Sequence, residues 1–447
     1  MTTRDRIAAL IAPAVARSKA VEEIAVGNGV MAEAASLYRR HFGDGPALIV
    51  ADGNTWPIAG KAVMRALEAD GIVARSHVLP ASPRPKPSVE LGREIVEALG
   101  DATAIAVGSG VINDVTKWAA YQTGKPYFCV ATAASMDGYS SAGAPLSEGG
   151  FKKTIPTRAP RAILADLDIV ASAPPAMSGW GYGDLAGKVP AGGDWIVADA
   201  LGVEPIDDIA WPLVQDNLDG WLAAPAAVRA GDADAIADLF VGLTLSGLAM
   251  EFHDSSRPAS GADHQIAHLW EMEGLTHDGT RVSHGACVSI GCLAVLGLYD
   301  WVIGRDLARI DADSIVAAAP SLDDKRAEID ALLSPEIAER AKDETRAKHL
   351  TPDAHRLRLA KIGSVWPDLR QRLAAHMRRA DAMRSSLAEA GAPTRAAEIG
   401  VSQARLAFTI RTSRFIRGRY TVLDLLDECG LLDAAVAATV AAPERVA

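Results

Sequence analysis

The fold is decided by the stretch Ala104-Ile105-Ala106-Val107-Gly108-Ser109-Gly110-Val111-Ile112-Asn113-Asp114. Its first four residues are apolar and suit a buried strand, and they run through a glycine turn into a helical pattern. Glycines let the backbone approach a ligand, and the start of the helix offers N–H groups to a phosphate. The turn is neither Gly-x-Gly-x-x-Gly nor a Walker loop, so a tight strand-to-helix turn without a ligand explains it equally well.

Strand–helix alternation of the same kind extends over the first third of the chain. Helical patterns at about residues 54–70, 88–99 and 111–123 separate short apolar, β-favouring runs, which are Ala47–Val50, Ile72–Ala74, Ala104–Val107 and Tyr127–Val130. This alternation predicts a parallel sheet whose ligand lies beyond the carboxyl ends of the strands. Four prolines between Pro80 and Pro87 indicate a loop.

The sequence beyond about residue 174 is rich in Ala, Leu, Arg and Glu at helical spacing, as in Pro335–Leu350 and Leu369–Ala390. We therefore expect two domains, an α/β nucleotide-binding domain over residues 1–173 and a helical domain over residues 174–447. The charged segment around residues 320–352 is typical of a solvated helix and shows no recognisable chemistry.

A second candidate ligand loop follows the next expected strand. It is the hydroxyl-rich run Thr132-Ala133-Ala134-Ser135-Met136-Asp137-Gly138-Tyr139-Ser140-Ser141. Local Asx or Ser/Thr turns account for one or two of these hydroxyls. The two loops follow successive strands, which favours a dinucleotide lying across the strand ends.

Three histidines in one window are the candidate metal ligands. His264 and His268 lie four residues apart in an expected helix that Ser260 can cap, so both imidazoles project from one face. His284 follows a short way downstream. Further side chains that spacing alone does not exclude are His253, His277 and Cys287, the last being more typical of a small buried core residue.

The carboxylate ligand is expected from Asp184, which follows three alternating glycines and would begin a helix. An N-cap is the common role of an aspartate in such a place, so Asp184 becomes a candidate ligand only in combination with the histidines. One Asp and two His leave an open coordination position, as a catalytic zinc requires. Ferrous iron, nickel and manganese accept the same donors.

The amino-acid composition limits the kinds of partner that the protein is expected to bind. The chain has 447 residues, of which 49% are hydrophobic, and a net charge of −11, so it can bury large cores and has no basic excess for a nucleic acid. Its four cysteines are scattered, which suits a reducing compartment. We find neither a signal-peptide pattern nor an uninterrupted apolar run long enough for a bilayer, and therefore expect a cytoplasmic protein without membrane partners.

Several motifs, in this order, resemble the sn-glycerol-1-phosphate dehydrogenase family, within the superfamily of 3-dehydroquinate synthase, glycerol dehydrogenase and iron-containing alcohol dehydrogenases. They are Gly108-Ser109-Gly110, Thr132–Gly138, Gly183-Asp184, Ser260–His264 with His268, and Ser283-His284-Gly285. The resemblance covers most of the chain, including Arg417–Asp424. It implies an α/β N-terminal Rossmann-like nucleotide-binding domain plus an all-α C-terminal domain, the dehydroquinate synthase-like fold.

The resemblance also implies a role for each matched residue. NAD or NADP would be bound by Gly108, Ser109, Gly110, Val111, Ile112, Thr132, Ala133, Ala134, Ser135 and Ser141. One divalent metal per chain, with zinc preferred over nickel or iron, would be held by Asp184, His264 and His284. The substrate would be contacted by Asp137, Asp184 and His268, of which Asp184 and His268 would be catalytic.

The implied enzyme is a metal-dependent NAD(P)-linked dehydrogenase that acts on the CH–OH group of a small phosphorylated polyol. Its expected reaction is reduction of dihydroxyacetone phosphate to sn-glycerol 1-phosphate by hydride transfer to C2, in a homodimer or higher homo-oligomer. The alternatives are a dehydroquinate synthase-like cyclase, a glycerol dehydrogenase-like polyol oxidoreductase and a non-catalytic nucleotide-binding module. The intact set of Asp184, His264 and His284 argues against the last.

Two departures from the family pattern concern the pocket. Ser109 stands where the family commonly has glycine, and the interval from His264 to His284 is longer than usual. Asp52, after the first expected strand, mildly favours NAD because a carboxylate there would repel a 2′-phosphate, although an ordinary Asp-Gly turn explains it too. The cationic partner of a substrate phosphate is left open among Lys117, Lys152, Lys153, Lys188 and Arg257.

Overall fold

The computed structural model describes residues 3–148 and 151–441, although the side chains of residues 151–153 lie outside this description. The chain divides into two compact units, each of which is discontinuous in sequence. Unit 1 comprises Met1–Leu185 and Pro212–Ser255, and unit 2 comprises Ala186–Trp211 and Ser256–Ala447. The expected division at residues 173 and 174 is a single cut, whereas the chain crosses between the units three times. The assignment of cofactor binding to residues 1–173 and of metal and substrate binding to residues 174–447 stays a prediction.

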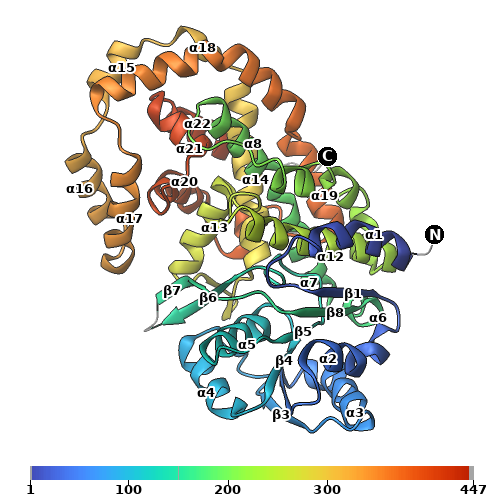
Figure 1. Cartoon of the computed structure of the whole chain (residues 1–447). Helices are drawn as coiled ribbons and strands as arrows, with labels where there is room; N and C mark the ends of the chain where they lie inside the picture. Colours follow the sequence, from blue (N-terminus) through green and yellow to red (C-terminus); the bar gives the residue numbers. More distant parts are fainter. Residues whose placement is uncertain (1–2, 149–150, 442–447) are drawn as a thin grey trace. The chain divides into compact units, whose positions relative to one another are not determined.

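Unit 1 is built on a six-stranded parallel sheet of order β1-β8-β5-β4-β2-β3 (Figure 1). The strands are β1 Glu23–Gly27, β2 Ala47–Asp52, β3 Ala74–Leu79, β4 Thr103–Gly108, β5 Phe128–Ala131 and β8 Ala162–Asp166. The four inner strands are apolar and buried along almost their whole length, as a parallel sheet covered on both faces requires.

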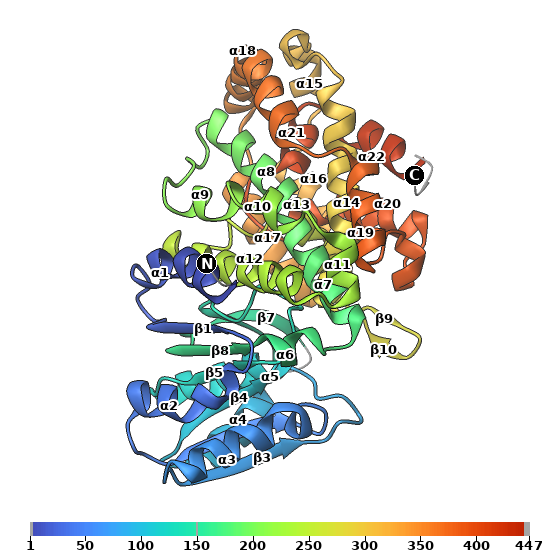
Figure 2. The same cartoon turned by 90° about the vertical axis from the view of Figure 1, so that its right-hand side faces the viewer.

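Helices cover both faces of this sheet. α2 and α3 lie on one face, and α4 and α5 lie on the other (Figure 1; Figure 2). Tyr38 and Val63 from the first pair pack with Ile49 and Val107 of the sheet in one buried core. The helices of unit 1 are α1 Thr3–Val15, α2 Ala34–Phe42, α3 Lys61–Ala69, α4 Val89–Leu99, α5 Gly110–Gln122, α6 Leu167–Ala171, α7 Pro175–Ala186, α10 Leu218–Trp221, α11 Pro225–Ala230 and α12 Ala233–Phe252. An antiparallel hairpin of β6 Gly143–Glu148 and β7 Phe151–Pro156 completes the unit.

In the part that the structure describes, unit 2 is helical apart from one short hairpin, β9 Thr276–His277 with β10 Thr280–Arg281 (Figure 2). Its helices are α8 Lys188–Ala200, α13 Ala262–Met272, α14 His284–Ile303, α15 Ala312–Ala318, α16 Leu322–Leu332, α17 Pro335–Lys348, α18 Pro352–His376, α19 Ala380–Ala390, α20 Gln403–Thr412, α21 Val422–Glu428 and α22 Leu432–Ala441. α14 packs against α13 very closely at Gly291, where a Cβ atom would lie 2.3 Å from the carbonyl oxygen of Asp263. The close approach of these two helices therefore depends on a glycine.

The structure confirms the expected alternation and corrects its details. The strand expected at Ile72–Ala74 begins only at Ala74, and β1 and β8 were not predicted. The helix expected over Leu369–Ala390 is two helices, because Met377 and Arg379 adopt extended backbone with ψ of 136° and 144°. The proline-rich stretch from Pro80 to Pro87 is free of regular helix and strand, as expected.

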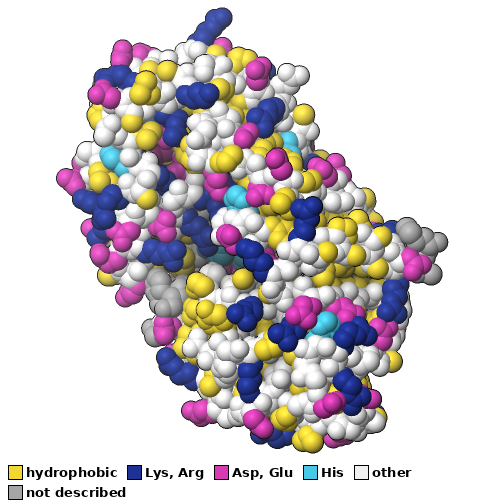
Figure 3. Space-filling view, in the orientation of Figure 1, with side chains coloured by type: hydrophobic (Ala, Val, Ile, Leu, Met, Phe, Trp, Pro, Cys, Tyr) yellow, Lys and Arg dark blue, Asp and Glu magenta, His cyan; other side chains and the backbone are white. Residues whose placement is uncertain are grey.

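Among the described residues, two helices, α12 and α14, are long and apolar enough to cross a membrane by length and composition, which the sequence did not lead us to expect. In each of them 78% of the apolar window is buried inside the structure, as in the core helices of a soluble protein. On the face shown in Figure 3, acidic and basic side chains are interspersed, in keeping with the modest net charge.

Candidate active site

The two candidate nucleotide loops lie side by side in unit 1. β4 and β5 are neighbours in the sheet, and Gly108 at the end of β4 pairs with Ala131 at the end of β5. The hydroxyls of Ser109 and Ser135 are 2.6 Å apart, so a hydrogen bond joins the glycine turn to the hydroxyl-rich loop. The chain leaves β2 and β4 in opposite directions along the sheet, so the glycine turn after β4 borders the crevice where open parallel sheets bind ligands, and the hydroxyl-rich loop after β5 lies next to that turn.

A buried lysine, Lys117, fixes the later part of the hydroxyl-rich loop by hydrogen bonds to its backbone. Lys117 is fully buried, and its ammonium donates to the carbonyl oxygens of Gly138 at 2.7 Å and Gly143 at 3.1 Å. Burial lowers the pKa of Lys117, against the influence of Asp114 3.8 Å away. Tyr139 donates to the carbonyl oxygen of Ala133 at 2.8 Å and fixes the other end of the loop. Lys117 therefore shapes the loop, which makes it a poor candidate for the cation that binds a substrate phosphate.

Asp184 lies in the last turn of α7, so the expectation that it begins a helix was wrong. It is completely buried, and its Oδ2 accepts the backbone N–H of Asp137 at 3.0 Å. The alternating glycines before it lie inside the helix, and one of them allows α7 to approach the hydroxyl-rich loop closely. At Gly181 a Cβ atom would be 2.0 Å from the carbonyl oxygen of Ala134. Within unit 1, the two expected substrate residues Asp137 and Asp184 are thus joined directly, and Asp137 is itself part of the hydroxyl-rich loop.

In unit 2 the three histidines form a triangle of imidazoles. The ring centroids of His264 and His268 are 5.9 Å apart, those of His264 and His284 5.3 Å, and those of His268 and His284 5.6 Å. His264 and His268 project from one face of α13, as their spacing predicted, and His284 is the first residue of α14. The close packing of α13 on α14 brings the rings together.

Each imidazole of the triangle is bonded through Nδ1 to a carboxylate. Nδ1 of His264 is 2.6 Å from Oδ2 of Asp263, and Nδ1 of His284 is 2.8 Å from Oε1 of Glu271. The other oxygen of Glu271 is 3.1 Å from Nδ1 of His268. A histidine that binds a metal commonly donates its second ring N–H to a carboxylate, which fixes the tautomer and turns Nε2 toward the ion. The donor set and its supporting carboxylates fit a divalent metal.

Glu271 was missed as a functional residue in the sequence. It lies three residues after His268 and seven after His264, on the same helical face, and this spacing was the available signal. One buried carboxylate serves two imidazoles, and it is only 4% exposed. Burial lowers the pKa of His268 to about 3, against the hydrogen bond to Glu271, so this imidazole is neutral near pH 7.

Asp194 is a second residue that the sequence did not reveal. Its Oδ2 accepts the N–H of Ala262 at 2.7 Å at the start of α13, and its Oδ1 accepts the N–H of Val422 at 2.8 Å and the hydroxyl of Tyr299 at 2.6 Å. Burial raises the pKa of Asp194 to about 6. The N-cap of α13 is Gly261, so the expected cap at Ser260 was wrong. Asp194 ties the histidine helix to α21 and α14 and is a positioning residue.

The remaining candidates lie outside the triangle. Cys287 is 1% exposed within α14, as a core residue would be. His277 lies in the β9–β10 hairpin, with Nε2 3.6 Å from Asp278, and His253 is the C-cap of α12 in unit 1. The same hairpin lies between His264 and His284 and accounts for the length of the interval between these two histidines.

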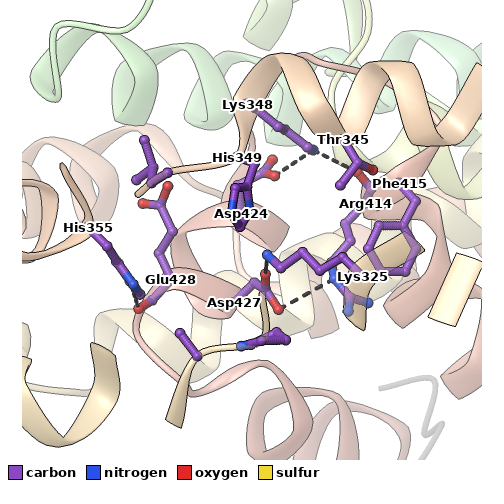
Figure 4. Close-up of a pocket in the computed structure, with 13 residues that line it drawn as sticks. Lys325, Thr345, Lys348, His349, His355, Arg414, Phe415, Asp424, Asp427 and Glu428 are labelled. Carbon is purple, nitrogen blue, oxygen red and sulfur yellow. Dashed lines mark hydrogen bonds and ion pairs between the residues drawn. The ribbon is translucent and has the colours of Figure 1, made fainter. Parts of the chain in front are cut away.

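Unit 2 also contains a polar cavity lined by residues of α16, α17 and α21 (Figure 4). Its charges neutralise one another. Lys325 is 2.9 Å from Asp427, and Lys348 is 2.6 Å from Asp424. Arg414 is 3.4 Å from Asp427, so each cation of this cavity already has an acidic partner. The cavity is a network of ion pairs that holds helices together, and it offers little excess charge to a ligand.

The fold is shared with solved dehydrogenase structures over most of the chain. Glycerol dehydrogenase from Schizosaccharomyces pombe superposes with a TM-score of 0.57 at 16% identity, covering 94% of this chain and 90% of that one. A probable glycerol dehydrogenase from Sinorhizobium meliloti gives 0.58 at 17% identity, covering 93% and 98%. A family model described as iron-containing alcohol dehydrogenase matches residues 25–174. These likenesses confirm the expected fold class, and the family model relates residues 25–174 to the iron-containing alcohol dehydrogenases.

Relatives of closer sequence identify the family. A glycerol-1-phosphate dehydrogenase (NAD(P)+) from Bacillus velezensis is 36% identical over 284 residues, which are 62% of this chain and 72% of that one. The protein of that name from Bacillus licheniformis is 34% identical over 299 residues, or 66% and 75% of the two chains. The chain therefore belongs to the glycerol-1-phosphate dehydrogenase family, and the resemblance carried by the motifs is confirmed.

Proposed function

We propose that the protein reduces dihydroxyacetone phosphate to sn-glycerol 1-phosphate by transfer of a hydride to C2. The relatives are named for glycerol 1-phosphate, which supports this substrate. The observation that carries the proposal is the imidazole triangle of unit 2, in which every Nδ1 is bonded to a carboxylate. Such an arrangement prepares Nε2 donors for a metal, and carbonyl reduction is chemistry that a divalent metal assists.

We assign the metal to His264 and His284 of unit 2 and to Asp184 of unit 1. The two Nδ1–carboxylate bonds support this assignment for the histidines, and the complete burial of Asp184 near Asp137 supports it for the carboxylate. Two nitrogens and one oxygen leave a position open to substrate, which favours zinc, while nickel and iron accept the same donors. When bound, the metal supplies Lewis-acid polarisation of the carbonyl, and the reduced nicotinamide supplies the hydride.

We assign the cofactor to the two loops at the strand ends, namely Gly108–Ile112, Thr132–Ser135 and Ser141. The first turn of α5 can donate its backbone N–H groups to a pyrophosphate. The space next to Gly110 is open. A Cβ atom built at this position would have its nearest neighbour, an atom of Met136, 3.8 Å away. The carboxylate of Asp52 accepts the N–H groups of Asn54 and Thr55 at 2.9 Å and 2.8 Å and so closes its own turn. A preference for NAD over NADP on account of Asp52 stays a prediction.

We assign the substrate to Asp137, Asp184 and His268, with Asp184 and His268 as catalytic residues. Nδ1 of His268 is bonded to Glu271, so in the neutral ring Nε2 is an acceptor. It can therefore hold a substrate hydroxyl, or a water molecule that delivers a solvent proton to the oxygen on C2 after hydride addition. Burial around Asp184 excludes water from the carboxylate side and strengthens its electrostatic interactions.

We also propose a cellular compartment, an oligomeric state and the kinds of partner for the enzyme. We infer a cytoplasmic homodimer or higher homo-oligomer that acts on a small phosphorylated substrate and binds neither nucleic acid nor membrane. The net charge of −11 supports the absence of nucleic-acid binding. Burial of most of α12 and α14 supports the absence of a membrane partner.

The test is replacement of His264 or His284 by alanine, with metal content and oxidation of NADH by dihydroxyacetone phosphate as readouts. Each variant is expected to lose bound metal and activity together. His277→Ala, which changes a histidine of the neighbouring hairpin, is the matched control and is expected to retain both. Retention of metal and activity in the first two variants would refute the site. Product formation without net NADH consumption would indicate a cyclase instead.

A further inference from the structure

Two arginines of unit 2 converge on one hydroxyl group beside the histidine helix. Nη1 of Arg417 donates to Oγ of Ser256 at 3.2 Å, and Nη2 of Arg419 donates to the same oxygen at 3.0 Å. Both arginines are only partly exposed. Since the Ser256 oxygen accepts from both guanidinium groups, its own O–H remains to be donated, so three donors face one region.

Neither arginine of this pair has a carboxylate within ion-pair distance among the residues that the structure describes. Glu271 and Glu344 act on Arg417 only from a longer distance, as Glu204 and Asp194 do on Arg419. Burial lowers the pKa of Arg417, and burial together with the charge of Arg417 lowers the pKa of Arg419 to about 9. Two like charges held this close in a partly buried place are destabilising, and an anion between them would offset the cost.

The loop that carries the pair is fixed to the histidine helix. Nη1 of Arg419 donates to the carbonyl oxygen of Ser260 at 2.5 Å, two residues before α13 begins. The N–H of Gly418 donates to Glu344 at 2.7 Å, which holds the middle of the loop. The pair is thus fixed at the N-terminal end of the helix that carries His264 and His268.

The sequence suggested five other cations as partners of a substrate phosphate. Those whose side chains are described have other roles in the structure. Arg257 is fully buried, is 2.7 Å from Glu204 and donates to the carbonyl oxygen of Tyr420 at 3.0 Å, so it supports the loop with its charge balanced. Lys117 holds the hydroxyl-rich loop of unit 1. Lys188 is fully buried at the start of α8, and the side chains of Lys152 and Lys153 lie outside the described residues.

We propose that Arg417 and Arg419, with the hydroxyl of Ser256, form the phosphate-binding subsite of the substrate pocket and select phosphorylated over unphosphorylated substrates. The proposal rests on the proposed function for the identity of the substrate. The guanidinium fork suits two phosphate oxygens at once, which an ammonium cannot reproduce. Selection follows because a substrate without the phosphate leaves the two positive charges without an anion.

The experiment compares Arg417→Gln, Arg419→Gln and Arg419→Lys with the wild type in two assays. The first is titration of the metal-loaded protein with inorganic phosphate, which requires no turnover. The second is KM and kcat for dihydroxyacetone phosphate and for dihydroxyacetone. We expect each glutamine variant to weaken phosphate binding and raise KM for the phosphorylated substrate by about 10- to 100-fold, with little change for dihydroxyacetone. Arg419→Lys is expected to recover part of the loss.

Arg411→Gln is the matched control, because Arg411 is a surface arginine of the same region that pairs with Asp433. It is expected to behave as the wild type. If a glutamine variant does not fold, as judged by its thermal midpoint, Arg419→Lys and the additional variant Arg417→Lys carry the test and should show smaller losses in the same direction. Unchanged phosphate binding and unchanged KM in the folded variants would overturn the subsite while leaving the proposed function standing. Loss of phosphate binding in a protein that never reduces dihydroxyacetone phosphate would support the anion site and refute the proposed substrate.

Discussion

Replacement of Glu271 by glutamine should weaken metal binding without removing any proposed ligand. Glu271 accepts from Nδ1 of His284 at 2.8 Å and of His268 at 3.1 Å. A glutamine amide offers one acceptor oxygen and one donor NH2 group, so it can satisfy only one of the two N–H groups. The other imidazole must rotate, or move its proton to Nε2, where it would block that nitrogen as a ligand.

The size of the effect follows from these two bonds. Whichever imidazole keeps the amide oxygen has exchanged a charge-assisted hydrogen bond for a neutral one, which is roughly half as strong. The other buried N–H is left without an acceptor, at a cost of about 1–3 kcal/mol. Loss of such a supporting carboxylate typically lowers metal affinity about 10- to 100-fold, or ~1.4–2.8 kcal/mol. We expect a loss in this range.

The assay is competition for the metal between the protein and a chelator of known affinity, monitored at equilibrium. Glu273→Gln is the matched control, since Glu273 lies two residues further on and pairs with Arg405 at the surface. It removes the same charge from the same part of the chain without touching the imidazoles. A dissociation constant for Glu271→Gln within twofold of that for Glu273→Gln would refute the role of Glu271.

Three further changes have defined outcomes. Gly181→Ala should destabilise unit 1 by about 1–3 kcal/mol, because the new Cβ atom meets the carbonyl oxygen of Ala134, and a lowered thermal midpoint would show it. Ser109→Ala breaks the 2.6 Å bond to Ser135 and should raise the Kd of NADH several-fold, by about 1 kcal/mol, in a fluorescence titration. Burial raises the pKa of Glu428 to about 7 from the ordinary 4.5, so the stability that its protonated form confers below pH 4.5 is lost as the pH rises to 7. Glu428→Gln should therefore show a smaller fall in thermal midpoint between pH 5 and pH 7 than the wild type, and an equal fall would contradict the assignment.

The fold of unit 1 could be predicted from sequence where strands are apolar and flanked by glycine or proline. β4 and β5 stand out for this reason, because buried parallel strands are continuous apolar runs. β1 was missed because Glu23 begins it and only its second half is buried. The split between α18 and α19 was missed because Met377 and Arg379 are compatible with a helix, and only tertiary packing makes them extended.

The candidate site could be predicted where spacing alone brings side chains together. His264 and His268 share a helical face by their separation, and the two candidate nucleotide loops follow adjacent strands. The supporting residues depend on contacts between distant segments. Asp194 meets Ala262 and Val422 across 68 and 228 positions of the chain, and Arg417 and Arg419 meet Ser256 across more than 160. No local pattern marks such residues.

The reaction that we propose for the chain is the metal-dependent reduction of dihydroxyacetone phosphate. The most direct measurement follows NADH or NADPH oxidation by this substrate before metal removal, after exhaustive chelation, and after zinc, nickel or iron is restored, with chiral analysis of the product. We expect that chelation abolishes activity, that a metal restores it, and that one sn-glycerol 1-phosphate forms for each nucleotide oxidised. Undiminished activity in the metal-stripped protein, or a metal-loaded protein that leaves dihydroxyacetone phosphate untouched, would contradict it.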